Sequence, residues 1–156
     1  SAYDPRLIEV TGISMMLTAQ GADHTVGNAA TFKCDDKNVE DLVAESLRMQ
    51  INAAVADSLG LCVFGRSVTD ENLELIANAI NDAFDAGVTP DFIRNIGVET
   101  LRIEAAFNNA AGFGEGDDEL PAFFHEEPLP PTGKIARLYS REVNAAMQNL
   151  MEAKSL

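Results

Sequence analysis

The segment Asp57-Ser58-Leu59-Gly60-Leu61-Cys62 places a carboxylate and a thiol five residues apart, with a glycine between them. Glycine lets the backbone turn sharply and lets a flat ligand approach it closely. A carboxylate in such a turn can accept hydrogen bonds from the N–H groups of a heterocycle, and a thiolate can ligate iron. The segment is therefore a candidate cofactor site.

A purely structural interpretation accounts for the same residues. Gly60 would end a helix, Cys62 would be a small buried side chain and Asp57 a solvated carboxylate. On these residues alone this interpretation is favoured. One cysteine cannot hold an iron-sulfur cluster, so a metal-binding role for Cys62 requires ligands from elsewhere.

The elements that must position this segment are helices. Residues 1–38 are rich in Gly, Thr, Asn and Asp, and we expect mostly loop with one short helix at 13–17. Residues 39–56 carry apolar side chains at helical spacing, and Asn38 is a suitable N-cap because its side-chain oxygen can accept a first-turn N–H. The helix is predicted to stop as it reaches Asp57.

Two further helices follow the loop 57–68. Thr69 is predicted to cap the first, which Gly87 terminates, and Thr89 followed by Pro90 opens the second, which ends at Gly112. The inward face of the first is predicted to be Leu73, Ile76, Ala77, Ile80 and Phe84, and that of the second Phe92, Ile93, Ile96, Thr100, Ile103 and Phe107.

The glycine-, proline- and acid-rich stretch from Gly112 to Gly133 is expected to run extended across the surface, and residues 140–154 form a last helix. No repeat, heptad pattern or sustained β-type alternation is present. We predict a mainly α-helical fold divided into 1–38, 39–112, 113–139 and 140–156, which together make one compact unit.

Composition limits the possible partners. Eleven Lys and Arg against twenty-five Asp and Glu give a formal charge of -14, which repels nucleic acids and anionic membrane surfaces. No apolar run approaches the roughly 20 residues that span a bilayer, and the start has no secretory-signal pattern. We expect a cytoplasmic protein with neither a nucleic-acid nor a membrane partner.

The chain has two cysteines, Cys34 and Cys62. They could form one disulfide, but a cytosolic chain of this size needs none, so free or metal-binding thiols are favoured. Cys34 has no histidine or cysteine at metal-ligand spacing and is interpreted as a bystander. A thiol-based redox protein that uses both cysteines remains a weaker alternative. His125, in the extended segment, is expected at the surface.

The segment 57–62 matches the D-x-x-G-L-C motif of the aldehyde ferredoxin oxidoreductases, and the chain resembles the C-terminal helical part of that family along nearly its whole length. Upstream, Asp4-Pro5-Arg6 and then Gly21-Ala22-Asp23-His24 resemble the segment that brings a histidine to the tungsten site. The family's closing segments follow in order at 97–101, Glu104, 107–108, 111–113, Asp118, 120–121 and 126–131.

The resemblance implies a role for each matched residue. Cys62 would be the fourth ligand of a [4Fe-4S] cluster, whose other three ligands lie in an upstream C-x-x-C-x-x-x-C run that this sequence lacks. Asp57, Leu61 and the backbone near Val63 would contact one pterin. His24 would act in proton transfer or substrate orientation near the metal, which suits an imidazole whose ordinary pKa is near neutrality.

For the parent enzyme the resemblance implies a tungstopterin, with tungsten or molybdenum, that oxidises an aldehyde to a carboxylic acid and passes electrons through the cluster to ferredoxin. The missing N-terminal domains of the same enzyme would be the main partner. The isolated chain is then expected to be an inactive helical unit without bound cofactor, and an exposed apolar face should drive its self-association. The alternative is a cofactor-free structural or interaction subunit that retains the family fold.

Departures from the family pattern bear on that alternative. Many relatives carry an arginine just before the G-A-D-H block and a lysine two residues after its histidine, where this sequence has Gln20 and Val26. Val98, Ala105 and Ala110 likewise stand where basic residues are expected in many members. These changes remove cations that would hold an anionic pterin.

Overall fold

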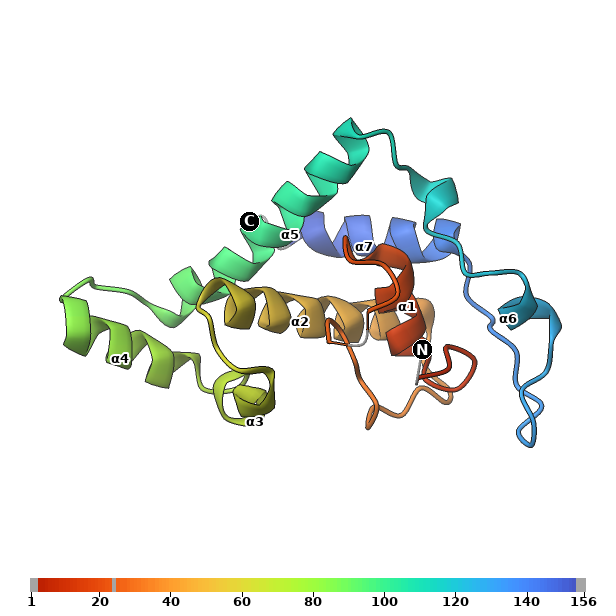
Figure 1. The fold of residues 1–156 in the computed structure, drawn as a ribbon, viewed down its shortest axis with the longest axis horizontal. Helices are drawn as coiled ribbons and strands as arrows, with labels where there is room; N and C mark the ends of the chain where they lie inside the picture. The colour runs from red at the N-terminus through yellow and green to blue at the C-terminus, as the bar shows by residue number, and fades with distance from the viewer. Residues whose placement is uncertain (1–2, 24, 154–156) are drawn as a thin grey trace.

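The computed structural model describes residues 3–23 and 25–153, and this part of the chain is helical, with a single isolated bridge and no strand (Figure 1). The mainly α-helical prediction is confirmed. The α-helices are α1 (Glu9–Leu17), α2 (Val39–Ser58), α3 (Arg66–Thr69), α4 (Leu73–Phe84), α5 (Pro90–Ala110), α6 (Phe123–Glu126) and α7 (Ser140–Ala153), and two 3-10 turns cover Val63–Gly65 and Glu115–Asp117.

Helix α2 is the centre of the fold, and α1, α5 and α7 all pack against it (Figure 1). The helix begins as its sequence predicts, because the Asn38 side-chain oxygen accepts the N–H of Asp41 at 2.8 Å. It extends to Ser58, two residues beyond the predicted end. Residues 50–56 of α2 are all buried, since α1, α5 and α7 surround this helix.

Helix α5 crosses α2 at a glycine. A Cβ at Gly97 would lie 2.5 Å from the carbonyl oxygen of Ile51, so only glycine permits this approach. The contact buries Ile93 and Val98 beside Gly97.

The prediction that Phe92, Ile103 and Phe107 lie on the buried side of α5 is wrong, because all three are exposed. The side of α5 that carries Gly97 packs on α2, because glycine allows the two backbones to approach closely. The larger side chains Phe92, Ile103 and Phe107 lie on other sides of the helix. Thr89 does cap the helix as predicted, since its hydroxyl accepts the Phe92 N–H at 3.2 Å.

Helix α4 begins at Leu73, and Asn72 occupies its N-cap position. The predicted cap, Thr69, instead belongs to the short helix α3. The end of α4 also differs: Asp85, not Gly87, is the first left-handed residue, and the Asn81 side chain exchanges two hydrogen bonds with the backbone of Val88. Phe84, the last residue of α4, was expected in the core but is 79% exposed.

Two apolar clusters make the core. The first joins α1, α2 and α7, and the second joins α2 to α4 and α5. Their most buried members are Val10, Ile13, Leu42, Val43 and Val143 in the first cluster and Leu47, Ile51, Val55, Ala77 and Ile93 in the second.

A buried polar network ties α1 to α2 inside this core. The hydroxyls of Ser14 and Ser46 lie 2.7 Å apart, and the Gln50 amide donates to Ser46 at 3.0 Å. Ser14 also donates to the carbonyl of Gly27 at 3.1 Å. Because buried polar groups are costly unless they are paired, this network fixes α1, α2 and the loop before α2 relative to one another.

The segment between α5 and α7 is more structured than the extended run that its composition predicts. It contains the 3-10 turn at 115–117, helix α6 and an isolated bridge between Leu129 and Lys134. Buried side chains at Leu120, Ala136 and Leu138 hold it against the first cluster.

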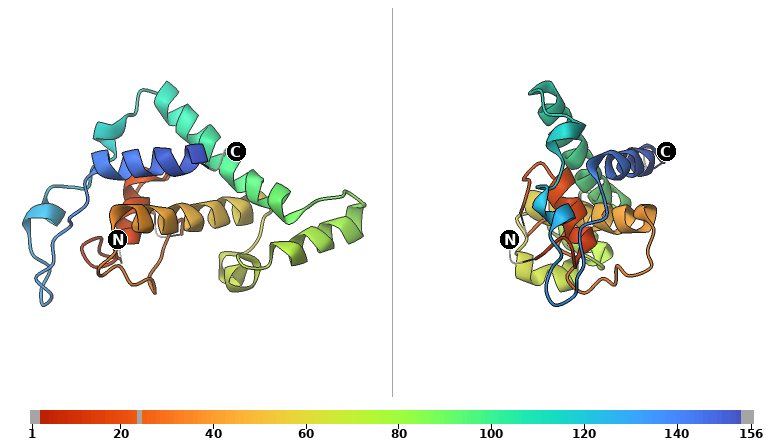
Figure 2. Two further views of the ribbon diagram at one scale, coloured as in Figure 1. Left: turned by 180° about the vertical axis from the view of Figure 1, so that it is seen from behind. Right: turned by 90° about the vertical axis from the view of Figure 1, so that its right-hand side faces the viewer.

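The helices divide into a body, made of α1, α2 and α7, and an arm, made of α4 and α5. Figures 1 and 2 show the C-terminal half of α5 leaving the body on one side of the crossing between α5 and α2, and α4 lying beyond the other side. Among the described residues, none of the helices combines the length and the apolar content of a membrane span.

Candidate functional site

The segment Asp57–Cys62 is the C-terminal cap of α2. The Leu61 N–H donates to the carbonyl of Ala56 at 2.8 Å, and the Gly60 N–H donates to that of Asp57 at 3.1 Å. Gly60 is left-handed, with φ of 67°. These two bonds and the left-handed glycine define a Schellman cap, so glycine is required here by the backbone itself.

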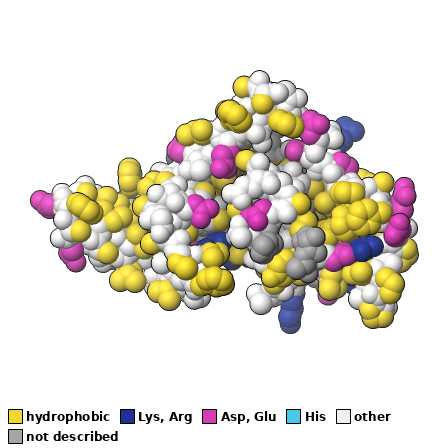
Figure 3. Space-filling model, viewed as in Figure 1, with side chains coloured by type: hydrophobic (Ala, Val, Ile, Leu, Met, Phe, Trp, Pro, Cys, Tyr) yellow, Lys and Arg dark blue, Asp and Glu magenta, His cyan; other side chains and the backbone are white. Residues whose placement is uncertain are grey.

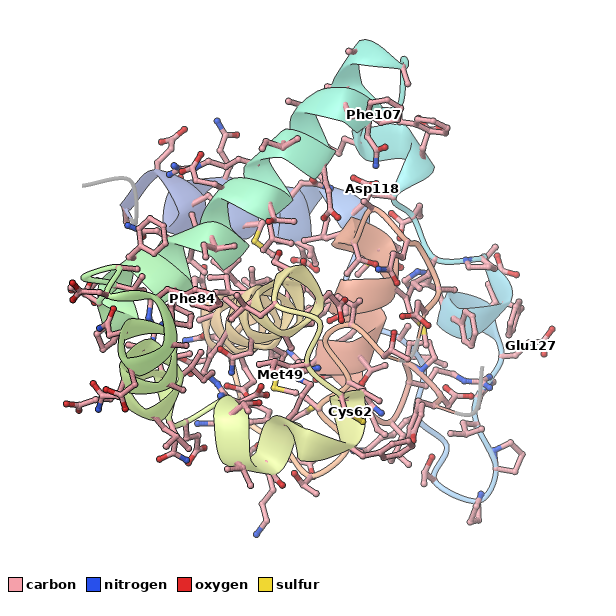
Figure 4. The ribbon with its side chains drawn as sticks, turned by 60° about the vertical axis from the view of Figure 1, so that its left-hand side comes forward. Met49, Cys62, Phe84, Phe107, Asp118 and Glu127 are labelled. Atoms are coloured by element: carbon pink, nitrogen blue, oxygen red, sulfur yellow. The ribbon has the colours of Figure 1, made fainter. Side chains whose placement is uncertain are left out.

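The cap delivers Cys62 to the surface (Figure 4). The thiol is free and exposed, so the interpretation of Cys62 as a small buried side chain is wrong. Its carbonyl accepts the N–H of Gly65 at 2.8 Å, which starts the 3-10 turn at 63–65. Phe64 in that turn is 93% exposed, and Val63 is also exposed. A thiol next to two exposed apolar side chains is suited to burial beneath another protein surface.

Asp57 lies in the last turn of α2, with its side chain exposed. A carboxylate is unfavourable at this end of a helix, because the unpaired carbonyls give it partial negative charge, and no basic residue in the turn offsets it. Leu61 is half-buried beside it. The carboxylate is therefore placed where a donor group of a ligand or a neighbouring protein would be stabilising.

Arg66 connects this cap to two other segments, although sequence reasoning did not single it out. Its guanidinium pairs with Asp70 at 3.0 Å and donates to the carbonyls of Thr25 and Met49, each at 3.3 Å. The side chain is only 11% exposed. Arg66 thus ties the turn after Cys62 to the loop that contains the G-A-D-H block. In the sequence, the only sign of this arrangement is an arginine followed four residues later by an aspartate, a spacing that allows an ion pair on a helix.

The loop 21–27 is held from several directions. The Asp23 carboxylate accepts the N–H groups of Thr25 at 3.1 Å and Val26 at 3.3 Å. A Cβ at Gly27 would lie 2.1 Å from the Ser14 hydroxyl oxygen, so this glycine allows the loop to press against α1. His24, the predicted catalytic residue, lies outside the described residues.

The two positions that depart from the family pattern have different surroundings. Gln20 is exposed, whereas Val26 is 7% exposed and packs inside the protein. A valine here contributes to the core and offers no group to an anionic ligand.

His125 is not at the surface as predicted. Its ring stacks on Tyr139 with centroids 4.3 Å apart, and its Nδ1 lies 3.0 Å from the carbonyl oxygen of Ala136. Its Nε2 lies 3.4 Å from the carboxylate of Glu119. Burial alone would raise the pKa of Glu119, but hydrogen bonds from the Ser140 N–H and hydroxyl outweigh it and leave the pKa below its ordinary value. This cluster fastens the 113–139 segment to α7 and lies apart in sequence from the candidate site.

The described side chains near Cys62 provide one ligand for an iron-sulfur cluster, the Cys62 thiol itself. Among residues 3–23 and 25–153, no three His, Cys, Asp or Glu side chains are grouped so that they could hold a metal ion. Cys34, the second cysteine, is buried and also free. A complete iron-sulfur site at Cys62 would need thiolates from other residues.

Comparison with known protein families gives a match over almost the whole chain. Residues 1–154 match a family model described as aldehyde ferredoxin oxidoreductase, domains 2 and 3. No curated protein and no solved structure matches the chain. The match covers both the D-x-x-G-L-C cap and the G-A-D-H loop.

Proposed function

The chain belongs to the aldehyde ferredoxin oxidoreductase family, and from this premise we propose that it is the C-terminal part of an enzyme that oxidises an aldehyde to a carboxylic acid, with ferredoxin as electron acceptor. In this proposal the chain contributes one cluster cysteine and part of a pterin pocket. The observation that carries it is the Schellman cap of α2, which presents Cys62 as a free, exposed thiol at the matched motif.

Cys62 is the proposed iron ligand. Its thiol is accessible, and its neighbours Val63 and Phe64 expose apolar surface that a further domain would bury. The other three thiolates would come from the N-terminal part of the same enzyme. The rigid cap supports this role, because a cluster ligand must be held in place before the remaining ligands close around the metal.

Asp57, Leu61 and Val63 are the proposed pterin contacts. The Asp57 carboxylate would accept hydrogen bonds from pterin N–H groups, while Leu61 and the backbone at Val63 would pack against the ring. The tungstopterin, when bound, supplies the two-electron oxidation chemistry, and the protein supplies positioning.

His24 is proposed to transfer a proton or orient the substrate. Its neighbours in sequence are well anchored, since Arg66 binds the Thr25 carbonyl and Asp23 accepts two backbone N–H groups. These contacts at Asp23, Thr25 and Val26 tie the G-A-D-H block to the turn after Cys62, which supports the proposal.

The main partner in this proposal is the rest of the enzyme, and the isolated chain is inactive and binds neither tungsten nor iron stoichiometrically. The reason is ligand number, because one thiolate does not retain a cluster. Elemental analysis of the purified chain after anaerobic incubation with iron and sulfide tests this. One cluster per chain would contradict the proposal.

The sharpest test substitutes the two cysteines in the natural full-length protein. Cys62→Ser should abolish the iron-sulfur absorption and electron transfer to ferredoxin, because serine is a poor iron ligand. Cys34→Ser is the matched control and should retain the cluster. If Cys62→Ser keeps a full complement of iron and its reduced-state EPR signal, Cys62 is not a ligand.

The gene gives an independent test. The proposal expects an upstream coding sequence continuous with Ala2, or encoded in a neighbouring gene, that contains the C-x-x-C-x-x-x-C run. If the natural protein starts near residue 1 and no such sequence is encoded, the catalytic proposal fails.

A cofactor-free structural subunit is the second candidate. Val26 favours it, because its side chain is buried and provides no cation where many relatives have a lysine. Asp57 separates the two candidates: in the full-length protein, Asp57→Asn should lower the bound tungstopterin if the pocket is functional. Asp85→Asn, at the end of α4, is the matched control. A full-length protein that lacks tungsten, molybdenum and iron altogether would favour the structural subunit.

A further inference from the structure

A cavity of about 110 Å³ lies between α1, α2, α5 and α7, where these helices meet beside the crossing of α5 with α2 (Figure 1). None of the residues in the segment 57–62 lines it. Its walls are mostly apolar, and they are formed by Leu17, Ala19, Leu47, Leu101, Ala105, Met147 and Met151. An apolar cavity of about 150 Å³ holds the six carbon atoms of benzene, so this cavity has room for about five non-hydrogen atoms.

Gln50 brings a buried amide to this cavity. It lines the cavity from α2 and is only 3% exposed. Its side-chain nitrogen donates to the Ser46 hydroxyl at 3.0 Å, whereas none of the described residues donates a hydrogen bond to its side-chain oxygen. A buried amide oxygen without a donor is costly, so this atom favours a ligand that carries N–H or O–H groups.

The hydrogen bonds of the core determine which end of the Gln50 amide is left for the cavity. The Ser14 hydroxyl donates to the carbonyl of Gly27 at 3.1 Å, and a carbonyl can only accept. The 2.7 Å contact between the Ser14 and Ser46 hydroxyls therefore needs the proton of Ser46, and the Ser46 oxygen accepts from Gln50. The hydrogen bonds run in one direction from Gln50 to Gly27, so the amide oxygen is the atom left to accept from a ligand.

Glu104 adds a carboxylate to the same cavity. Its side chain is half-buried on α5, and no lysine or arginine in the described part of the chain forms an ion pair with it. The described residues that line the cavity include no lysine, arginine or histidine. Figure 3 shows acidic side chains at both ends and in the middle of one face of the molecule, so the surroundings also disfavour an anion. The cavity therefore combines apolar walls with two hydrogen-bond acceptors and one negative charge.

We propose that this cavity binds a small primary ammonium ion with an apolar chain of about four carbons. The ammonium N–H groups donate to the Gln50 side-chain oxygen and to the Glu104 carboxylate, and the methylene groups pack between Leu101 and Met147. An alkylammonium group resembles the lysine side chain, whose ordinary pKa of about 10.4 keeps it charged at pH 7. An alcohol of the same size has one donor and no charge, so it leaves one acceptor unpaired. The proposal does not depend on the catalytic role given above, because it involves neither Cys62 nor a cofactor.

NMR titration of the chain with butylammonium at pH 7 measures this binding. A ligand of this size should bind with a dissociation constant on the order of 1 mM. Binding should shift the signals of the Gln50 side-chain amide and of the Met147 and Met151 methyl groups, because these side chains line the cavity. Absence of these shifts at about twenty times the expected dissociation constant would overturn the proposal.

Butan-1-ol tests what the charge of the ligand contributes, because it has the same length as butylammonium and is neutral. It should bind about tenfold more weakly, since charge-assisted hydrogen bonds are the stronger ones. Glu104→Gln should remove this difference. Glu74→Gln is the matched control, because it makes the same change of charge at an exposed side chain of α4 that does not line the cavity. Equal binding of the two ligands by the wild type, or an equal loss of preference in both variants, would refute recognition of the ammonium group by Glu104.

Ala105→Phe tests the position of the site. Ala105 lines the cavity and is exposed, so a larger side chain can occupy the cavity without disturbing the core. This variant should bind both ligands at least about tenfold more weakly. Ala106→Phe is the matched control, because Ala106 is the next exposed residue of α5 and does not line the cavity. Equal effects of the two substitutions, with unchanged helical circular dichroism, would place the bound ligand elsewhere and overturn the proposal.

The natural full-length protein shows whether the cavity stays open to a free ligand. The methyl signals of Met147 and Met151, observed after isotope labelling of methionine, should shift with butylammonium in that protein as they do in the chain. Binding by the chain but not by the full-length protein would mean that a side chain from another domain fills the cavity, and it would overturn the proposal.

Discussion

The body and the arm use large apolar side chains in opposite ways. In the body, Leu42, Val43 and Val143 are completely buried. In the arm, Leu75, Phe84 and Ile103 are exposed, although they are equally apolar. The body therefore has a packed core to which the arm adds Ala77 and Ile93, whereas the arm also keeps a surface that another protein can cover. Apolar content alone does not distinguish a folding core from an interaction surface.

The largest expected effect comes from comparing alanine substitutions of two leucines, one in the body and one in the arm. Leu42→Ala should lower the free energy of unfolding by about 3 kcal/mol, because it leaves a cavity in a packed core. Leu75→Ala should change it by less than about 0.5 kcal/mol, since Leu75 is exposed on α4. Urea unfolding of both variants measures the two effects. A cost for Leu75→Ala close to that of Leu42→Ala would show that the arm has a core of its own.

The buried polar network is a second device confined to the body. Ser46→Ala should cost about 2 kcal/mol, because it removes the partner of both Ser14 and Gln50 inside the core. Ser67→Ala, at an exposed serine of α3, is the matched control and should be nearly neutral. Thermal unfolding followed by circular dichroism reports both. An unchanged melting temperature for Ser46→Ala would mean that the network adds no stability.

The junction between body and arm depends on Gly97. Gly97→Ala should cost about 1 kcal/mol, because the new methyl group must push α5 away from the Ile51 carbonyl, while alanine's better helix propensity offsets part of the strain. Gly65→Ala adds a methyl group that meets nothing within 4 Å and is the control. Urea unfolding measures both. If Gly97→Ala is stabilising, the close approach does not determine the crossing.

Gly97 also shows where prediction from sequence succeeds and where it fails. The existence of α2, α4, α5 and α7 follows from apolar spacing and from the caps at Asn38 and Thr89, because these signals are local. The apolar spacing of α5 does not show which face of this helix is buried. The buried face depends on how closely a neighbouring helix can approach. The prediction that the large apolar side chains Phe92, Ile103 and Phe107 mark the buried face was therefore wrong.

The candidate site divides in the same way. The glycine cap at Asp57–Cys62 could be predicted, since six consecutive residues and the family motif carry it. The clamp of Arg66 could not, because its two carbonyl acceptors lie 41 and 17 residues away in the chain. The burial of His125 was missed for the same reason: Glu119 and Tyr139, which enclose it, approach only when the 113–139 segment folds back onto α7.

The smallest predicted effect tests the outer edge of the body, where the N-terminal segment is fastened. Hydrogen bonds from Arg6 hold the pKa of Asp4 below its ordinary value of 3.8. Because the folded-state pKa is the lower one, this pair stabilises the fold above about pH 4 and its contribution is lost as acid protonates Asp4. Asp4→Asn should therefore lower stability slightly at pH 7 and flatten its decline in acid, with Asp82→Asn on α4 as the charge-matched control. Urea unfolding from pH 2.5 to 7 measures the slope, and equal slopes for the wild type and Asp4→Asn would show that the Asp4–Arg6 pair adds no stability.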